Sequence, residues 1–232
     1  LQKNMEKLQK KSENIDFFKG IKVVVFDFDD TLVDEQYFIK TRWEKVLGNY
    51  AFLSKKLKET FFDIYRQKGP QYPFHLDDAL EKLHIDSKYK REILASLKKE
   101  TGDELLLGGA MEIITALKEK GLSVGIITDG QRARQEKRIK KAGIYDQMDF
   151  IYYGVGAKEK KPDKKVMKEI FEKYHITSPR EFLYIGNDFL LDIEGFLAIG
   201  AKGCLVGKEE DPPAHPNLII VKSVKELWKK EF

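Results

Sequence analysis

The chain has 232 residues, of which 42% are hydrophobic and 34% are charged, and its formal net charge is +4. This length and apolar fraction suffice for one large domain, or for one domain with a sizeable insertion. A net charge this small lacks the strongly basic balance that indicates nucleic-acid binding from composition alone. We therefore expect a soluble globular protein whose composition gives no sign of a nucleic-acid partner.

No apolar run approaches the roughly 18 to 20 residues of a membrane span, so no membrane association is expected. Residues 1–19 are lysine-rich and lack the apolar centre of a secretory signal. Cys204 is the only cysteine, which excludes an intrachain disulfide and agrees with a cytoplasmic location. Because the first residue is Leu1, the domain is also compatible with fusion to another catalytic domain, or with action on the product of a separate one.

Residues 1–19 form a polar lead that favours a helix, and the run "IKVVVFDF" that follows has the pattern of a strand buried on both faces. Between residues 36 and 104 the apolar residues recur at helical spacing, and no convincing strand is found. Helices and strands alternate from residue 105 onward. The further predicted strands are "LSVGIIT", "DFIYYG", "EFLYIG", "KGCLVG" and "NLIIV".

This alternation predicts an α/β fold, in which a Rossmann-like parallel sheet carries helices on both faces. The core domain is expected to comprise residues 1–35 and 105–232, and an inserted α-helical cap domain is expected at residues 36–104. Open sheets of this kind bind ligands at the carboxyl ends of their strands. A functional site is therefore predicted at that edge.

Four polar clusters lie at strand ends or helix starts: "DFDDT", "TDG", "KKPD" and "GNDFLLD". Each alone is a weak signal, because a pair of aspartates or a lysine before proline has many structural uses. Three aspartates directly after a buried strand are unusual, since carboxylates repel one another and resist desolvation. In this order, and on these elements, the four clusters together indicate one catalytic site.

The four clusters resemble the motifs of the haloacid dehalogenase-like superfamily, and the helical insertion is similar to the cap of its subfamily I. The resemblance extends from Ile21 to about Val221. It implies a Mg²⁺-dependent phosphatase, a phosphoric monoester hydrolase that acts on a small phosphorylated metabolite through an aspartyl-phosphate intermediate. The residues that select the substrate would lie in the cap, where no motif can be read.

The resemblance also implies a role for each matching residue. Asp27 is the nucleophile, and Asp29 protonates the leaving alcohol and then activates water. Thr128 donates a hydrogen bond to a phosphate oxygen, and Lys161 pairs with the nucleophile and the phosphate. The metal is held by the side chain of Asp27, the backbone carbonyl of Asp29 and the side chain of Asp188.

Two assignments stay open in the sequence. In one alignment of "GNDFLLD", Asn187 is the metal ligand with Asp192 as its partner; in the other, Asp188 is the ligand. We favour Asp188 because an anionic oxygen suits Mg²⁺ better than a neutral amide. Either Lys160 or Lys161 could be the lysine that pairs with the nucleophile. We favour Lys161 because it directly precedes Pro162.

Other functions are also compatible with these motifs. A phosphomutase of the same superfamily is the main alternative, followed by a phospho-accepting module and a non-catalytic binding domain. Asp30 is expected to be a turn residue. The basic residues after the second strand are expected to form a solvated helix face and not a nucleic-acid site. They are Arg132, Arg134, Lys137, Arg138, Lys140 and Lys141.

Overall fold

The computed structural model describes residues 19–69, 72–154, 161–207 and 212–229. The predicted helical lead at residues 1–19, apart from Lys19, thus lies outside the described residues, as does Lys160, the alternative to Lys161 as the catalytic lysine. The described residues form two compact units. A sheet unit contains the residues up to Asp34 and those from Leu105 onward, and a helical unit contains Glu35–Glu104.

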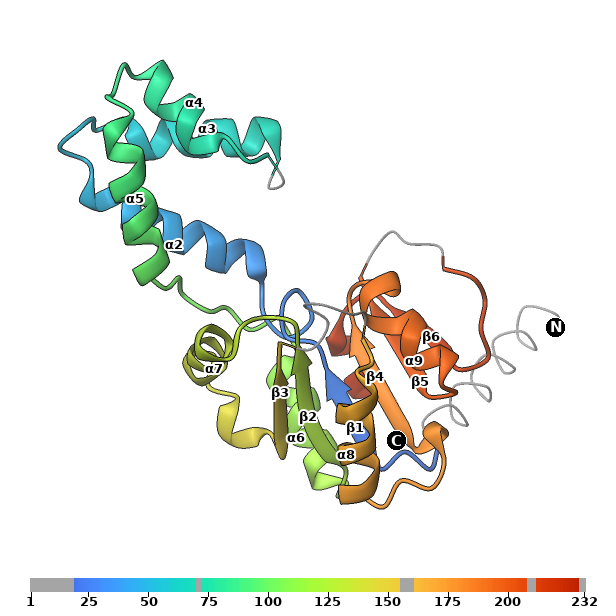
Figure 1. Cartoon of the computed structure of the whole chain (residues 1–232). Helices are drawn as coiled ribbons and strands as arrows, with labels where there is room; N and C mark the ends of the chain where they lie inside the picture. Colours follow the sequence, from blue (N-terminus) through green and yellow to red (C-terminus); the bar gives the residue numbers. More distant parts are fainter. Residues whose placement is uncertain (1–18, 70–71, 155–160, 208–211, 230–232) are drawn as a thin grey trace. The chain divides into compact units, whose positions relative to one another are not determined.

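The sheet unit is built on six parallel strands in the order β3-β2-β1-β4-β5-β6, and Figure 1 shows β1 between β2 and β4. This confirms the predicted Rossmann-like α/β fold. The strands are β1 (Val23–Phe26), β2 (Ser123–Thr128), β3 (Phe150–Tyr153), β4 (Phe182–Gly186), β5 (Lys202–Val206) and β6 (Leu218–Val221). Since all run in parallel, their carboxyl ends share one edge.

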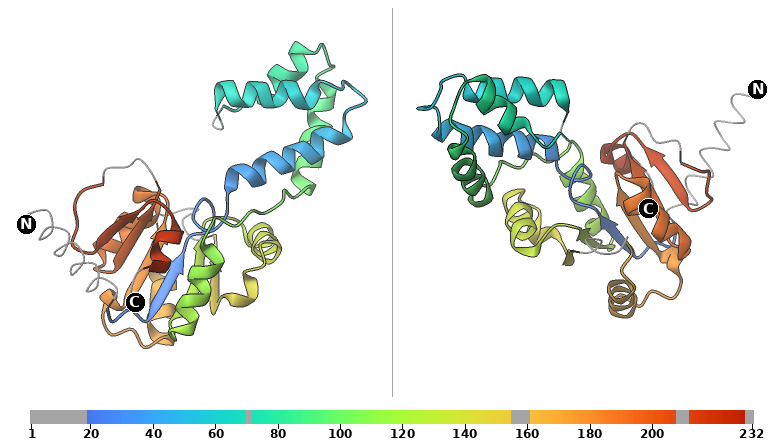
Figure 2. Two further views of the ribbon diagram at one scale, coloured as in Figure 1. Left: turned by 180° about the vertical axis from the view of Figure 1, so that it is seen from behind. Right: turned by 45° about the horizontal axis from the view of Figure 1, so that its top comes forward.

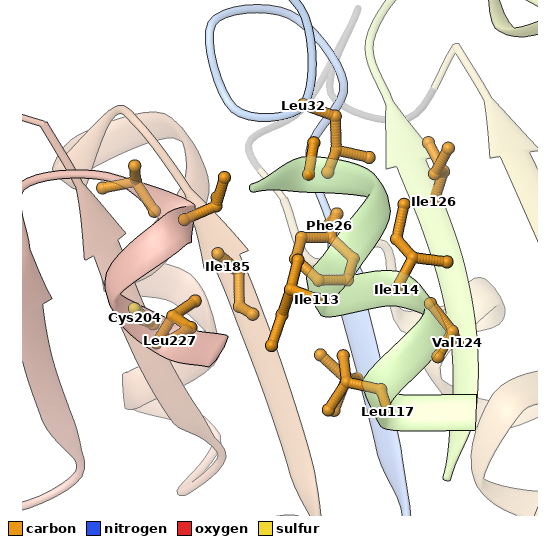
Figure 3. Packing of buried hydrophobic residues seen from close by; sticks show 14 of the residues in the cluster. Phe26, Leu32, Ile113, Ile114, Leu117, Val124, Ile126, Ile185, Cys204 and Leu227 are labelled. Atoms are coloured by element: carbon orange, nitrogen blue, oxygen red, sulfur yellow. The ribbon is translucent and has the colours of Figure 1, made fainter. Parts of the chain in front are cut away.

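Strand β1 is buried on both faces, as its unbroken apolar run predicts. Val24 and Phe26 belong to one apolar cluster, whereas Val23 and Val25 belong to the cluster on the other face, because side chains alternate along a strand. Figure 3 shows Phe26 packed among side chains from the neighbouring strands and from helix α6 (Ala110–Glu119).

Helices cover both faces of the sheet. Helix α6 contributes to the cluster that contains Phe26, and α8 (Lys164–Lys173) contributes Met167 and Ile170 to the other cluster. The remaining helical segments of this unit are α7 (Arg132–Lys141), α9 (Glu194–Ala198), a π-helix η3 (Phe189–Ile193), and the 3₁₀ segments η1 (Tyr145–Gln147), η2 (Pro179–Glu181) and η4 (Val224–Lys229).

The helical unit has its own core, and none of its described residues forms a strand. Its helices are α2 (Glu35–Asn49), α3 (Leu57–Lys68), α4 (His75–Lys82) and α5 (Lys88–Lys99), which can be followed in both views of Figure 2. Phe61 is fully buried there, with its ring centre 4.4 Å from that of Trp43. No helix among the described residues is long and apolar enough to cross a membrane.

The chain leaves and re-enters the sheet unit through two segments that are bonded to each other. The Asp34 amide donates to the Leu105 carbonyl at 2.9 Å, and the Leu107 amide donates to the Leu32 carbonyl at the same distance. A bridge between Val33 and Leu106 lies between these bonds. Asp30 precedes this segment in a turn with φ of 52°, as its expected turn role requires.

Candidate active site

Asp27 and Lys161 form a buried ion pair at the carboxyl end of β1. Asp27 directly follows the strand, and its amide donates to the Ile185 carbonyl of β4 at 2.8 Å, which extends the sheet by one residue. Lys161 Nζ lies 2.7 Å from Asp27 Oδ1, and the lysine is 2% exposed. Residues 134 positions apart in the chain therefore meet through the fold.

The same ammonium group also contacts two further acids. Its distance to Asp192 Oδ1 is 2.9 Å, and its distance to Asp129 Oδ1 is 3.4 Å. Asp192 is 3% exposed, so two of the three carboxylates around Lys161 are buried. One cation thus serves three acids, which leaves excess negative charge at this sheet edge.

The pKa values follow from this crowding. Burial raises the pKa of Asp27 to about 8, against the lowering effect of Lys161, while Asp192 raises it further. Burial also raises the pKa of Asp129. Burial by itself would lower the pKa of Lys161, but Tyr184 and then the three neighbouring acids more than offset this, and the pKa is raised overall. Lys161 therefore stays charged, and Asp27 is held ionised only with cationic help.

Asp29 lies in a second network whose partners come from helix α7. Arg138 Nη1 lies 2.6 Å from Asp29 Oδ1, and Gln135 Nε2 donates to Asp29 Oδ2 at 2.8 Å. Gln135 Nε2 also donates to Thr128 Oγ1 at 2.9 Å. Arg138 is 1% exposed, and Gln135 is fully buried. The network joins two residues that sequence motifs had placed at separate strand ends.

This burial corrects the prediction for Arg138, which was grouped with the solvated basic residues of its helix. Arg138 is buried because Asp29 supplies a carboxylate and the ring of Phe28 lies 5.1 Å below its guanidinium group. The sequence did contain a signal. Gln135, Arg138, Ile139 and Ala142 recur at helical spacing, so both polar residues share the face of an apolar pair.

The segment "GNDFLLD" divides its polar side chains among different partners. Asp188 Oδ1 accepts the Leu191 amide at 2.8 Å, so this carboxylate caps the π-helix. Asn187 Oδ1 accepts from Thr31 Oγ1 at 3.4 Å, and Asn187 lines a cavity of about 410 Å³ together with Asp30. Asp192 turns to Lys161 instead. Asn187 and Asp188 thus both lie at the end of β4. The side-chain oxygen of each accepts one hydrogen bond, and only Asn187 is among the residues that line the cavity.

The donor set of the site suits a hard cation. No group of three His, Cys, Asp or Glu side chains within the described ranges forms a ready-made metal cluster. The expected set does not need one, because it combines two side chains with a backbone carbonyl. Carboxylate and carbonyl oxygens are the ligands that Mg²⁺ prefers. The excess of carboxylates over Lys161 is what a bound divalent cation would balance.

The helical unit has a separate cavity of about 460 Å³ between α2 and α3. Phe62 and Tyr65 form an aromatic part of its wall. The charged part is mixed: it contains the basic residues Lys40, Lys58 and Arg66 and the acidic residues Glu44 and Glu59. Tyr65 donates a hydrogen bond to Gln36 Oε1 at 2.9 Å. From the sequence, Phe62, Tyr65 and Arg66 are expected to be structural, since no motif marks a cavity between two amphipathic helices.

Comparison with known proteins gives consistent matches. A family model described as haloacid dehalogenase-like hydrolase matches residues 24–206. The chain is 25% identical over 192 residues to a glyceraldehyde 3-phosphate phosphatase of Pyrococcus furiosus, which covers 79% of this chain and 80% of that protein. It is 27% identical over 217 residues to a pyrimidine 5'-nucleotidase of Escherichia coli, with coverages of 88% and 95%.

Solved structures share the fold. A HAD-hydrolase from Bacillus subtilis, crystallised with magnesium, matches with a TM-score of 0.62 at 20% identity, over 90% of this chain and 97% of that one. A haloacid dehalogenase-like hydrolase from Xanthomonas campestris matches with a TM-score of 0.60 at 21% identity, over 90% and 93%. At these identities the likeness concerns the fold alone.

Proposed function

Because the chain belongs to the haloacid dehalogenase-like hydrolase family, we propose that it is a phosphatase that hydrolyses the phosphate monoester of a small metabolite. One observation carries the proposal. The two acids that follow β1 have separate cationic partners, Asp27 with Lys161 and Asp29 with Arg138. Each carboxylate is thus held in its own position, which suits a nucleophile and a proton-transfer group that act on different atoms of the ester.

The first step is attack by a carboxylate oxygen of Asp27 on phosphorus. A bond forms between Asp27 and phosphorus, the bond from phosphorus to the ester oxygen breaks, and Asp29 gives that oxygen a proton. At an effective dielectric constant near 20 and ~4 Å, each pair of unit like charges costs about 4 kcal/mol. Lys161 lowers this barrier because its ammonium lies beside the attacking carboxylate.

The second step releases phosphate. Asp29 now accepts a proton from a water molecule, which attacks phosphorus and breaks its bond to Asp27. Thr128 would hold a phosphate oxygen through its hydroxyl in both steps. A Mg²⁺ ion bound by Asp27, the Asp29 carbonyl and Asp188 would supply positive charge. That charge would keep Asp27 ionised and offset the negative charge of the phosphate.

The ligand at the end of β4 can be tested separately. Asp188 already accepts one backbone hydrogen bond, but a carboxylate has further acceptor sites free for a metal. We expect Asp188→Asn to weaken Mg²⁺ binding, measured by titration calorimetry on the protein alone. An unchanged affinity, with a large loss in Asn187→Ala, would move the assignment to Asn187.

We also propose that Glu35–Glu104 is a cap that selects the leaving group. The wall of its cavity combines two aromatic rings with side chains of both charges, so it suits a polar or aromatic group. A panel of sugar, triose and nucleoside phosphates tests this with wild type and Tyr65→Ala. The variant is expected to change the order of preference among substrates. An unchanged order, with equal kcat/KM values, would exclude that residue from selection.

The decisive experiment is an assay of phosphate release from p-nitrophenyl phosphate and from that panel, with Mg²⁺ and with EDTA. Wild type and Asp27→Asn are compared, with Asp146→Asn as the matched control because Asp146 is exposed and lies away from the site residues in sequence. Metal-dependent release that only Asp27→Asn abolishes supports the phosphatase. Phosphate transfer within the substrate, without release, would favour the phosphomutase instead.

A further inference from the structure

Helix α7 carries a buried polar pair, Gln135 and Arg138, one turn apart. The proposed mechanism assigns these two side chains no part, although both contact residues that it uses. Buried arginine is rare unless it is paired, and Arg138 pairs here with the Asp29 carboxylate. Burying a guanidinium group costs free energy that packing alone does not return, which indicates that Arg138 acts on Asp29.

The hydrogen-bond inventory fixes how the pair is oriented. Arginine only donates, so the contact of 3.1 Å from Arg138 Nη1 must be to the oxygen of the Gln135 amide. The amide nitrogen of Gln135 is thereby turned toward the other side of the network. Its two hydrogens account for the bonds to Asp29 Oδ2 at 2.8 Å and Thr128 Oγ1 at 2.9 Å.

The orientation of Gln135 has a consequence for Thr128. A hydroxyl group has one proton to donate, and its oxygen here already accepts from Gln135. No acceptor for that proton is found among the residues that the structure describes, and the side chain is 1% exposed. The Thr128 proton is thus left for a ligand oxygen. Gln135 sets the polarity of this hydroxyl.

The chain makes room for the pair at Gly130, the last residue of "TDG". A Cβ atom on Gly130 would lie 2.3 Å from Cγ and 2.5 Å from Cδ of Gln135. Only glycine leaves that space, so the backbone after β2 and the amide of Gln135 fit each other. The network is therefore constrained from three sides, by Gly130, by Phe28 under the guanidinium group, and by Asp29.

We propose that Arg138 and Gln135 are positioning residues for the reaction. Arg138 holds the Asp29 carboxylate in place for proton transfer and fixes the Gln135 amide, and Gln135 directs the Thr128 proton toward the phosphate. This inference rests on the proposed function, in which Asp29 is the acid and base and Thr128 a phosphate ligand. Two separate readouts follow, since one effect concerns the leaving group and the other concerns phosphate binding.

The leaving group tests Arg138. We compare kcat/KM for p-nitrophenyl phosphate, whose phenolate leaves without a proton, with kcat/KM for an alkyl phosphate, whose alkoxide needs one. Arg138→Met is expected to lower the alkyl value by about 10²- to 10⁴-fold, the range of general acid catalysis, and the nitrophenyl value far less. Arg138→Lys is expected to restore part of the alkyl value, since an ammonium can donate to the same oxygens.

Gln135→Glu tests the hydroxyl orientation. The side chain keeps its shape but offers acceptors only, so the Thr128 proton is expected to turn to it. Binding of inorganic phosphate, measured by titration calorimetry, is then expected to weaken by roughly 10- to 100-fold, the range for a hydrogen bond to a charged group. Arg134→Met on the exposed side of the same helix is the control and should leave both readouts unchanged.

The outcomes separate this inference from the proposed function. Equal losses for both leaving groups in folded Arg138→Met would overturn the role of Arg138. Unchanged phosphate affinity in Gln135→Glu would overturn that of Gln135. If wild type hydrolyses no ester but binds phosphate, the phosphatase proposal fails and the calorimetry still decides for or against Gln135. A wild-type chain that does neither would overturn both proposals.

Discussion

Replacing Lys161 by methionine removes the cation that, among the described residues, contacts all three acids, but keeps a side chain of similar length. Lys161 Nζ lies 2.7 Å from Asp27 and 2.9 Å from Asp192, and the lysine is 2% exposed. Removing one partner of a buried ion pair costs about 3–5 kcal/mol, because the other partner is left as an uncompensated charge. We expect a loss of this size in the free energy of unfolding at alkaline pH.

The loss is expected to depend on pH in a definite direction. The pKa of Asp27 in the folded state is raised to about 8, so between its unfolded value and that pH the folded chain binds more protons than the unfolded chain. Stability therefore falls as the pH rises through this range. Without Lys161, which lowers the pKa of Asp27, this fall in stability continues to higher pH. At pH 5 a protonated Asp27 needs no cation, so the variant should lose less stability than at pH 9, although Asp192 still loses its partner.

The assay is urea unfolding at pH 5, 7 and 9, with EDTA present so that no bound cation replaces the ammonium. Lys168→Met is the control, because Lys168 makes only a surface contact of 3.8 Å and should change stability by no more than about 0.5 kcal/mol. A Lys161→Met loss that is the same at pH 5 and pH 9 would refute the reasoning, since it would point to packing and not to charge.

Three further predictions concern stability. Gly195→Ala is expected to cost about 1–3 kcal/mol in urea unfolding, because its methyl group would lie 2.1 Å from the carbonyl of Lys161; Gly48→Ala, with nothing within 4 Å, is its control and should gain up to about 1 kcal/mol of helix propensity. Glu181→Gln should lower the thermal midpoint at pH 7 but not near pH 2. A backbone N–H and then a lysine lower the pKa of Glu181 to about 2, so the stability that the carboxylate contributes is lost as the pH falls through that value. An equal loss of the midpoint at both pH values would contradict this. Phe61→Ala should cost the helical unit about 3–5 kcal/mol by urea unfolding, since Phe61 is fully buried, and a smaller cost would show that the site collapses around the missing ring.

The sequence by itself determined the sheet and the location of the first acids. A run of β-branched residues such as "VVV" has no polar face and favours a strand that is covered on both sides. Side chains alternate along such a strand, so Val23 and Val24 enter opposite clusters. Parallel strands then bring their ends together, so the proximity of Asp27, Thr128 and Lys161 to one edge follows from local patterns.

Only the tertiary structure decided how those side chains are partnered. The helical spacing of Arg138 with Ile139 and Ala142 indicates a shared face, but only the fold identifies the partner that pairs with its charge, Asp29, 109 residues earlier. The pairing of Lys161 with Asp192 and the capping role of Asp188 depend on a π-helix, which no local pattern predicts. Partners set the charge state and orientation of a polar group, and partners are a property of the fold.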